Sequence, residues 1–398
     1  MKYDFDTVID RRGTWSAKWE GWRAHPDYQA PFTERTIPMM VADMDLKTAP
    51  AIIEEMHRVA DFGMWGYTSE NASPEYARAV CGWYARRHNW HFAPEAVQHI
   101  NGTVAAIGVA LKAFTAPGDS IVICRPVYGH FTSYIQDQGR RVESVHLIDD
   151  GTGYYTMDFD GIDKAMAKEE NKIFLLCNPA NPAGRVWTEE ELRTLSEICK
   201  KHDKLLISDE VHCDIVRTGL QYVPMGRVAA EGTKLIVVTG VNKTFNLAGL
   251  FCSQAIIPDK ALREAYQAHI GEYQPTPFAV AACIKAYGGE CDDWVDALNE
   301  YLDGNIDFAL AYMKEHLPKA RCRRPEGTYT LWIDFSGYGL SDEEVHRRIY
   351  SPEGADVRLQ DGLVHDPDQG ACFQRMCVSC ARSVVKEALE RIAAQFEG

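Results

Sequence analysis

Four short apolar runs, separated by stretches with helical patterns, constrain the fold of this chain more than any other feature. They occupy residues 120–126, 172–179, 204–210 and 233–240, and each ends in polar or turn-forming residues. Continuous apolar strands separated by helices are typical of a parallel sheet that is covered on both faces. We therefore predict an α/β fold in which helices cover a mostly parallel sheet.

The helix expected between the second and third of these runs has its own start signal. Residues 188–202 place Leu192 and Leu195 on one face, and Thr188 and Glu191 have the spacing of a capping box. This pattern predicts an amphipathic helix that packs its apolar face on the sheet.

The pattern changes after about residue 290, which indicates a second domain. The elements expected there are a long helix, a strand and a helical tail, at 292–317, at 328–335 and from Ser383. A chain of 398 residues is also too long for one ordinary core. We predict a large domain over residues 46–288 and a smaller α+β domain formed by residues 1–45 and 289–398.

Composition and charge argue against several classes of protein. The net charge of −15 does not favour a nucleic-acid partner, because phosphate binding requires clustered cations. No uninterrupted apolar run reaches the length of about 18 residues that a membrane span needs, and the first residues lack the apolar run of a secretory signal. Twelve cysteines without such a signal are typical of reduced thiols, so we expect a cytoplasmic protein.

Two of these cysteines, Cys377 and Cys380, form a CxxC pair. A single pair is a weak signal for zinc or for redox chemistry. The alternative is two small residues packed in a strand. We expect no metal site.

Polar residues follow each predicted strand. They are Tyr128, Asn178 and Asn181, Asp209, and Lys243. In open α/β sheets the ligand site lies beyond the carboxyl ends of the strands. These residues are therefore the first candidates for a binding or catalytic site.

Lys243 and Asp209 suit a site for an aldehyde cofactor. A lysine can hold such a cofactor as a Schiff base and can move a proton at the substrate's Cα. A carboxylate that pairs with a pyridine nitrogen keeps the ring protonated and makes it a better electron sink. Taken alone, Lys243 could equally be an ordinary surface lysine. Asp209 alone could equally be a helix cap. His212 lies three residues after Asp209 and is a further candidate.

Three more features suit the same site. The segment 178–184 contains two prolines and a glycine, which favour a rigid turn from which an asparagine can donate. Residues 101–106 begin an alanine-rich helix, whose free N–H groups and dipole favour a phosphate. Tyr128 could lie over a planar heterocycle, and ordinary core packing is the alternative.

In order along the chain, these pieces resemble fold-type I pyridoxal-phosphate (PLP) enzymes of the aminotransferase superfamily, and within it the cystathionine β-lyase branch of C–S lyases. The resemblance covers nearly the whole chain. It rests on PMMVADMDL (38–46), GYT (66–68), PGD (117–119), PVY (126–128), MDFD (157–160), NPANPAGRVWTEEEL (178–192), SDEVHCD (208–214), NKTFNLAGL (242–250) and PEGTYTLWIDF (325–335). It implies that residues 46–288 form the PLP-binding domain.

The resemblance also implies roles for the candidate residues around the PLP ring. Lys243 would form the Schiff base and act in catalysis, and Asp209 would bind the pyridine nitrogen. Asn181 and His212 would contact the side of the ring that carries the phenolic oxygen. Tyr128 would stack on the ring.

Further roles implied by the resemblance concern the phosphate, the neighbouring subunit and the substrate. The residues that would hold the phosphate are Gly102, Thr103 and Val104. Tyr67 would reach the phosphate of the neighbouring subunit, which implies a homodimer with shared active sites. Arg375 would bind the substrate's α-carboxylate as a bidentate guanidinium, and Ala42 would present a backbone N–H to the same group.

The chain departs from the family's pattern at several positions. Asn242 replaces the usual serine before the lysine. Gly240 stands at a position where the family commonly has a side chain with a hydroxyl. Phe251 takes the place of an aminotransferase arginine that the lyase branch also lacks. Residues 364–366 replace an apolar-glycine segment, and Cys377 replaces an asparagine.

The expected activity is α,β-elimination from cystathionine or an S-substituted cysteine, which yields a thiol, pyruvate and ammonia. Two alternatives use the same residues. An aminotransferase would return the proton to the cofactor carbon instead of expelling a group from Cβ. A PLP-fold regulator would bind the cofactor without turnover.

Overall fold

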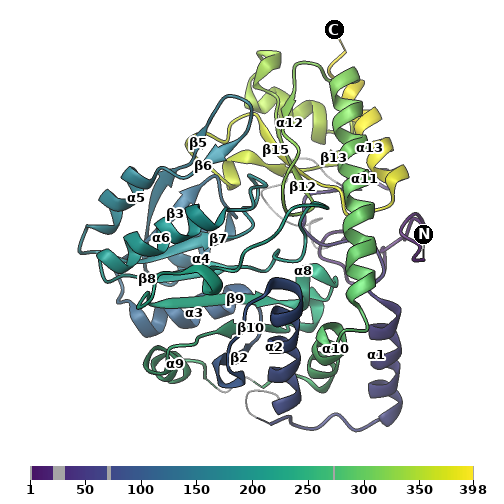
Figure 1. Cartoon of the computed structure of the whole chain (residues 1–398). Coiled ribbons are helices and arrows are strands. Elements are labelled where there is room, and N and C mark those ends of the chain that lie inside the picture. Colours follow the sequence, from purple (N-terminus) through teal and green to yellow (C-terminus); the bar gives the residue numbers. More distant parts are fainter. Residues whose placement is uncertain (1, 21–31, 70–72, 272–273, 398) are drawn as a thin grey trace.

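The computed structural model describes residues 2–20, 32–69, 73–271 and 274–397. A seven-stranded sheet forms the centre of the larger part of the molecule (Figure 1). In spatial order its strands are β2 (Val97–Ile100), β10 (Ser253–Ile256), β9 (Leu235–Gly240), β8 (Leu205–Asp209), β7 (Asn171–Cys177), β3 (Ser120–Arg125) and β4 (Arg141–His146). Neighbouring strands are parallel except at β10, which runs antiparallel to both β2 and β9.

The four apolar runs of the sequence form β3, β7, β8 and β9, and the predicted α/β fold is confirmed. The sequence pattern did not reveal β2, β4 and β10. β4 lies at the edge of the sheet and is mostly half-buried, and β10 carries Ser253 and Gln254 inside the sheet. Polar residues therefore interrupt the apolar run by which the other strands are recognised.

Side chains that alternate along the strands fill a separate core on each face of the sheet. Successive residues of a strand point to opposite faces. Ile121 accordingly packs with α3 (Thr103–Phe114) on one face, and Val122 packs on the other face with α5 (Phe159–Met166) and α6 (Glu189–Lys201). The strands need to be apolar on both faces because helices cover both.

Helix α6 begins at the predicted capping box. The Thr188 hydroxyl accepts a hydrogen bond from Glu191 N at 3.2 Å, and Thr188 N donates to Glu191 Oε2 at 2.8 Å. Leu192 and Leu195 are buried against the sheet. The predicted helix is therefore confirmed, with an N-terminal cap of the kind that contributes about 1 kcal/mol.

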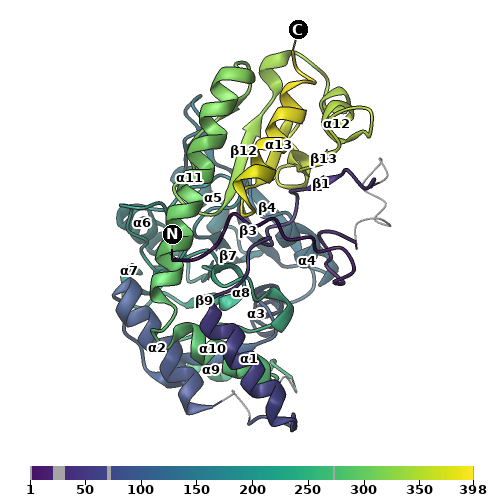
Figure 2. The same ribbon diagram turned by 90° about the vertical axis from the view of Figure 1, so that its right-hand side faces the viewer.

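A second, antiparallel sheet forms the centre of the smaller part. In spatial order its strands are β11 (Arg321–Cys322), β12 (Thr330–Asp334), β15 (Phe373–Cys377) and β14 (Gln360–Asp361). Helices α12 (Asp342–Tyr350) and α13 (Arg382–Ala393) pack in the same core. The short strand β1 (Ile37–Pro38) pairs with β13 (Val357–Arg358), so an N-terminal segment lies with the C-terminal part of the chain (Figure 2).

The long helix α11 (Asp292–His316) connects the two parts (Figure 1). Trp294 and Leu298 in its first half pack in the core of the larger part, whereas Ile306 and Met313 pack in the core of the smaller part. The helix is shared by both cores. The domain boundaries given above stay predictions.

The twelve cysteines are all free thiols. Cys377 ends β15, but Cys380 lies beyond the strand, so the expectation that both pack in a strand is wrong for Cys380. The Sγ atom of Cys377 lies 3.1 Å from the Ser379 hydroxyl. None of the helices in the described part of the chain is long and apolar enough to cross a lipid bilayer.

Candidate active site

Lys243 lies on a short helix that directly follows β9. This helix, α8 (Val241–Thr244), begins where the strand ends at Gly240. The Nζ atom of Lys243 donates to the carbonyl oxygen of Ala42 at 2.6 Å. The half-buried amine is thus held against a main-chain segment that is about 200 residues away in the sequence.

The surroundings of Lys243 favour its neutral form. Desolvation lowers the pKa of Lys243, and the nearby charge of Arg375 acts in the same direction. The carboxylates of Asp43 and Asp209 oppose this fall in the pKa without cancelling it. A lysine with a lowered pKa is a better nucleophile and a better base near neutral pH.

Two side chains clamp the segment that contacts the lysine. Asn246 adopts a positive φ of 56°, and its amide donates to Met44 O at 3.0 Å and to Leu46 O at 2.9 Å. The Tyr329 hydroxyl donates to Ala42 O at 3.1 Å. Neither Asn246 nor Tyr329 was predicted to lie at the site, although both lie in fragments that carry the family resemblance. Their partners are distant in sequence, so no local pattern signals these contacts.

Asp209 is the last residue of β8 and is buried. Its Oδ1 accepts a hydrogen bond from Val211 N at 3.2 Å. Burial raises the pKa of Asp209 to about 7, and the Val211 hydrogen bond and the charge of Lys243 offset only part of that rise. A carboxylate in this position gains strongly from a cationic or N–H partner.

His212 is buried at the same edge of the sheet. Burial lowers its pKa well below the usual value, and the charges of Lys243 and Arg375 lower it further. Its Nδ1 is buried and has no hydrogen-bond partner among the described residues. The imidazole is therefore neutral and has a ring nitrogen available for a ligand.

Arg375 joins the two parts of the molecule. It lies in the middle of β15 and is buried. Its Nη1 donates to Asn181 Oδ1 at 3.1 Å, and its Nη2 donates to Met40 O at 2.6 Å. Asn181 belongs to the turn after β7, where Asn178–Pro179 and Asn181–Pro182 are cis peptide bonds. A guanidinium from the smaller part thus meets the carboxyl edge of the large sheet.

The start of α3 lies at this edge as well. Ser253 of β10 pairs with Ile100 at the end of β2 and with Gly240 at the end of β9, so the helices that follow the two strands begin beside one another. Among the described residues no side chain caps the first turn of α3, and Gly102 before it has a φ of 105° that favours glycine. The residues with free N–H groups at such a start can bind an anion. The predicted phosphate residues are the ones at this position, Gly102, Thr103 and Val104.

Tyr128 follows β3 and is half-buried. Burial raises the pKa of Tyr128 to about 12, although the charge of Arg375 opposes the rise. The edge of its ring contacts Phe131, with 5.6 Å between the ring centroids. The phenol of Tyr128 therefore stays protonated, and Phe131 packs against the edge of its ring.

Tyr67 is not part of this cluster. It lies between α1 (Pro50–Phe62) and α2 (Pro74–His88), and its side chain is 100% exposed. Met64 and Trp65 beside it are also exposed. The other predicted site residues of the larger part lie at the carboxyl edge of the sheet, and Ala42 and Arg375 contact that edge. Tyr67 instead lies on an exposed apolar surface.

A family model described as aminotransferase class I and II matches residues 36–392. The chain belongs to this family.

Relatives of this aminotransferase-family chain include C–S lyases. Cystathionine beta-lyase PatB of Bacillus subtilis (strain 168) is 34% identical over 397 residues, which cover 98% of this chain and 99% of PatB. The PLP-bound C–S lyase of Staphylococcus hominis, complexed with the inhibitor L-cycloserine, has a TM-score of 0.92 and 31% identity, and the match covers 99% of this chain and 98% of that one. Cystalysin of Treponema denticola, whose structure contains PLP, has a TM-score of 0.92 and 31% identity, with 99% of each chain covered.

Two departures from the family's pattern form one packed unit. A Cβ atom on Gly240 would lie 2.7 Å from the Ser253 hydroxyl and 2.9 Å from Cys252 O, so the close approach of β10 requires glycine. Asn242 Nδ2 donates to that same Ser253 hydroxyl at 2.8 Å. The Oδ1 atom of Asn242 is buried without a partner among the described residues. Gly240 and Asn242 therefore accommodate Ser253 together.

A third departure lies beside Tyr128. His365 is buried, its Nδ1 lies 3.0 Å from Val127 O, and its carbonyl oxygen accepts from Arg125 Nη1 at 2.9 Å. Val364 leaves no room for a side chain at position 129, because a Cβ on Gly129 would meet its carbonyl oxygen at 2.4 Å. Residues 364–366 thus hold the loop that carries Tyr128.

Proposed function

We propose that this chain is a PLP-dependent C–S β-lyase. It cleaves cystathionine or S-substituted cysteines to a thiol, pyruvate and ammonia by α,β-elimination. One observation carries this proposal: a desolvated lysine and a desolvated carboxylate at the carboxyl edge of the large sheet meet a buried arginine from the smaller part. Full-length similarity to a cystathionine β-lyase supports the choice of reaction.

The residues at this edge suit PLP. Asp209 is a buried carboxylate that a protonated pyridine nitrogen would pair with, and burial has already raised its pKa to about 7. His212 and Asn181 are polar groups on the same side for the phenolic oxygen. The uncapped start of α3, at Gly102, Thr103 and Val104, provides N–H donors for the phosphate. The ring of Tyr128 is the candidate for stacking on the cofactor.

When bound, PLP supplies an aldehyde for linkage to an amine and a ring that withdraws electrons from the substrate's Cα. Lys243 is the residue whose Nζ would hold that aldehyde and would give it up to the substrate's amino group. The freed Nζ then removes the Cα proton. General acid–base help of this kind is commonly worth about 10²–10⁴-fold.

Asp209 keeps the proton on the pyridine nitrogen during the reaction. Its negative charge is compensated by that proton, so the carboxylate no longer bears the full cost of its burial. His212 is neutral and does not compete for this charge.

Arg375 binds the α-carboxylate of the amino acid, with the backbone N–H of Ala42 as a second donor. The guanidinium is already held by Asn181 Oδ1 and Met40 O, so little of its side-chain freedom is left to lose when the substrate binds. Lys243, or Tyr67 of the neighbouring subunit, protonates the departing thiolate. Water then hydrolyses the released 2-aminoacrylate to pyruvate and ammonia.

The exposed position of Tyr67 supports a homodimer. An exposed tyrosine with Met64 and Trp65 beside it is suited to contact a second copy of the chain. In the proposed dimer, Tyr67 of each subunit reaches the phosphate in the neighbouring subunit's site. We also propose a cytoplasmic location, where twelve free thiols stay reduced.

The test is an assay of two products at once. PLP-loaded protein is incubated with L-cystathionine or an S-alkyl cysteine, and pyruvate and free thiol are measured together. The proposal predicts equal amounts of both. Amino-group transfer that requires an added keto acid would instead identify an aminotransferase, and PLP binding without turnover of any amino acid would favour a regulator.

A further inference from the structure

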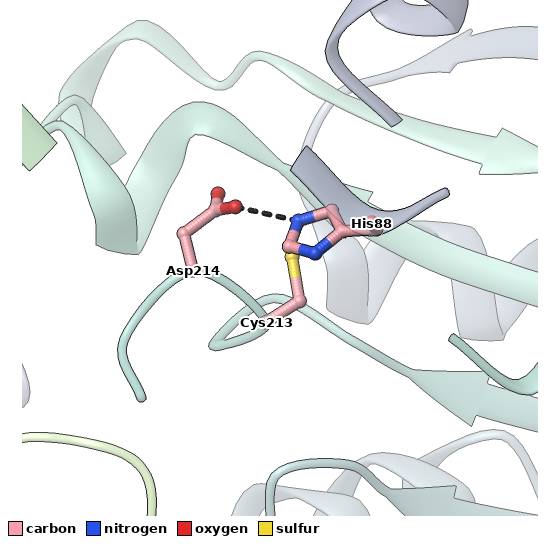
Figure 3. Close-up of side chains that lie close together, drawn as sticks. All are labelled: His88, Cys213 and Asp214. Atoms are coloured by element: carbon pink, nitrogen blue, oxygen red, sulfur yellow. Dashed lines mark hydrogen bonds and ion pairs between the residues drawn. The ribbon is translucent and has the colours of Figure 1, made fainter. Parts of the chain in front are cut away.

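His88, Cys213 and Asp214 form a buried cluster, in which Cys213 and Asp214 belong to the loop that follows β8 (Figure 3). His88 is the last residue of α2, and its Nε2 donates to Asp214 Oδ1 at 2.7 Å. These residue types are found in metal sites, in nucleophile triads and in purely structural networks. The hydrogen bonds of the cluster distinguish these roles.

The cluster is not arranged to bind a metal or to attack a substrate. Besides His88, Trp83 Nε1 donates to Asp214 Oδ1 at 3.1 Å, and Thr244 Oγ1 donates to Asp214 Oδ2 at 2.8 Å. Both carboxylate oxygens are therefore engaged by donors of the chain itself. Burial raises the pKa of the Cys213 thiol well above its usual value, and only a thiolate ligates metal or acts as a nucleophile.

One of these hydrogen bonds leads directly to the candidate active site. Thr244 is the residue after Lys243, and it is fully buried. Helix α8 has only four residues, too few to hold a fixed position by its own hydrogen bonds. Its position is therefore set by what its side chains contact.

Asp214 connects this short helix to the rigid part of the core. Its carboxylate contacts α2 through Trp83 and His88, and its carbonyl oxygen accepts from Asn299 Nδ2 of α11 at 2.8 Å. The donors on Oδ1 fix the rotation of the carboxylate, so Oδ2 faces Thr244. Asn246, two residues after the end of α8, is held by its contacts with Met44 and Leu46.

We infer that Asp214 is a positioning residue that, through Thr244, holds Lys243 at the place where its Nζ meets the substrate. The inference rests on the proposed function, because it assigns Asp214 to the reaction of Lys243. Asp214 touches neither substrate nor cofactor. A displacement of a reacting group by about 1 Å can cost on the order of 10²-fold in rate, so a hydrogen bond two steps away can matter.

The test is a pair of substitutions at Thr244 in the PLP-loaded enzyme. Thr244→Val keeps the shape of the side chain and removes the hydroxyl, so we expect kcat to fall about 10- to 100-fold while KM stays within about twofold. The apparent Kd for PLP, measured by absorbance titration of the apoprotein, should rise about tenfold because the linkage to Lys243 forms less readily. Thr244→Ser restores the donor and should return kcat and Kd to within about threefold of the wild type.

Thr36→Val is the matched control. Thr36 Oγ1 donates to the buried Asp356 Oδ1 at 2.7 Å, which is the same kind of bond outside the site. This variant should lose thermal stability to a similar extent as Thr244→Val and should keep kcat and the Kd for PLP. If Thr244→Val also lowers only the melting temperature, Asp214 is merely structural and the inference is overturned.

A double-mutant cycle provides a second measurement. Asp214→Asn should lower kcat as Thr244→Val does, and the two losses should not add in the double variant because they remove the same contact. Additive losses would overturn the inference. Thiol release and PLP binding by the wild type are measured first, so failure of the proposed function is recognised before the variants are compared.

Discussion

Three side chains at the candidate site titrate differently from their free counterparts. Burial raises the pKa of Asp209 to about 7 and lowers the pKa of Lys243 and of His212. In each case desolvation of the charged form is the largest cause, and the charge of Arg375 adds to the effect on the two bases. The site thus favours a neutral lysine and a carboxylate in need of a proton partner. A lowered pKa of Lys243 is the direction that removal of the Cα proton requires.

Substitution of Arg375 is expected to weaken substrate binding. Arg375→Ala should raise KM and lower kcat/KM on the order of 10²-fold, since it removes a buried charge that faces the α-carboxylate. Arg375→Lys should recover only part of this loss, because an ammonium cannot make the bidentate contact. Steady-state kinetics with L-cystathionine measures both effects.

Arg193→Ala serves as the control, because Arg193 forms an exposed i,i+4 pair with Glu189 on α6. Its kinetics should match those of the wild type. Wild-type kinetics in Arg375→Ala would remove Arg375 from the site.

At the scale of elements, local patterns predicted most of the sheet and missed part of it. Continuous apolar runs revealed β3, β7, β8 and β9, because strands that are buried on both faces have no polar face. β10 was not predicted because it contains the polar residues Ser253 and Gln254, which are buried and hydrogen-bonded inside the fold. Periodicity alone cannot distinguish such residues from exposed ones.

The same limit applies to the elements of the site. Motifs placed Asp209 at the end of a strand and Lys243 just after one, because strand ends are local features. The contacts that fix the lysine could not be predicted from motifs. Asn246 reaches Leu46, and Thr244 reaches Asp214, across 200 and 30 positions of sequence respectively. Such pairs depend on how the elements pack.

At the scale of the whole molecule, Tyr67 bears on whether two subunits share their active sites. Tyr67 is fully exposed, whereas the other predicted site residues lie at the carboxyl edge of the large sheet or, like Ala42 and Arg375, contact it. No pattern in the sequence shows whether an exposed tyrosine completes a neighbour's site. The family resemblance alone suggested it.

A hybrid-dimer experiment tests the shared site. Lys243→Ala and Tyr67→Phe should each be strongly impaired as homodimers. If Lys243 and Tyr67 of one site come from different subunits, a heterodimer contains one intact site and one doubly altered site. Random re-association of equal amounts should then restore about a quarter of wild-type activity.

Subunit exchange in this mixture is checked by native mass spectrometry with one variant tagged. Exchange without any gain in activity would contradict the proposal that Tyr67 serves the neighbouring site. The same mixture of two copies of one variant is the control, and it should show no gain.

Chemical trapping identifies the lysine that binds the cofactor. PLP-loaded protein is reduced with borohydride, digested and mapped by mass spectrometry. We expect one phosphopyridoxyl group, on the peptide that contains Lys243. In Lys243→Ala both this group and the visible absorbance band should be lost. A label on another lysine, or an unaltered spectrum in Lys243→Ala, would contradict the assignment of Lys243.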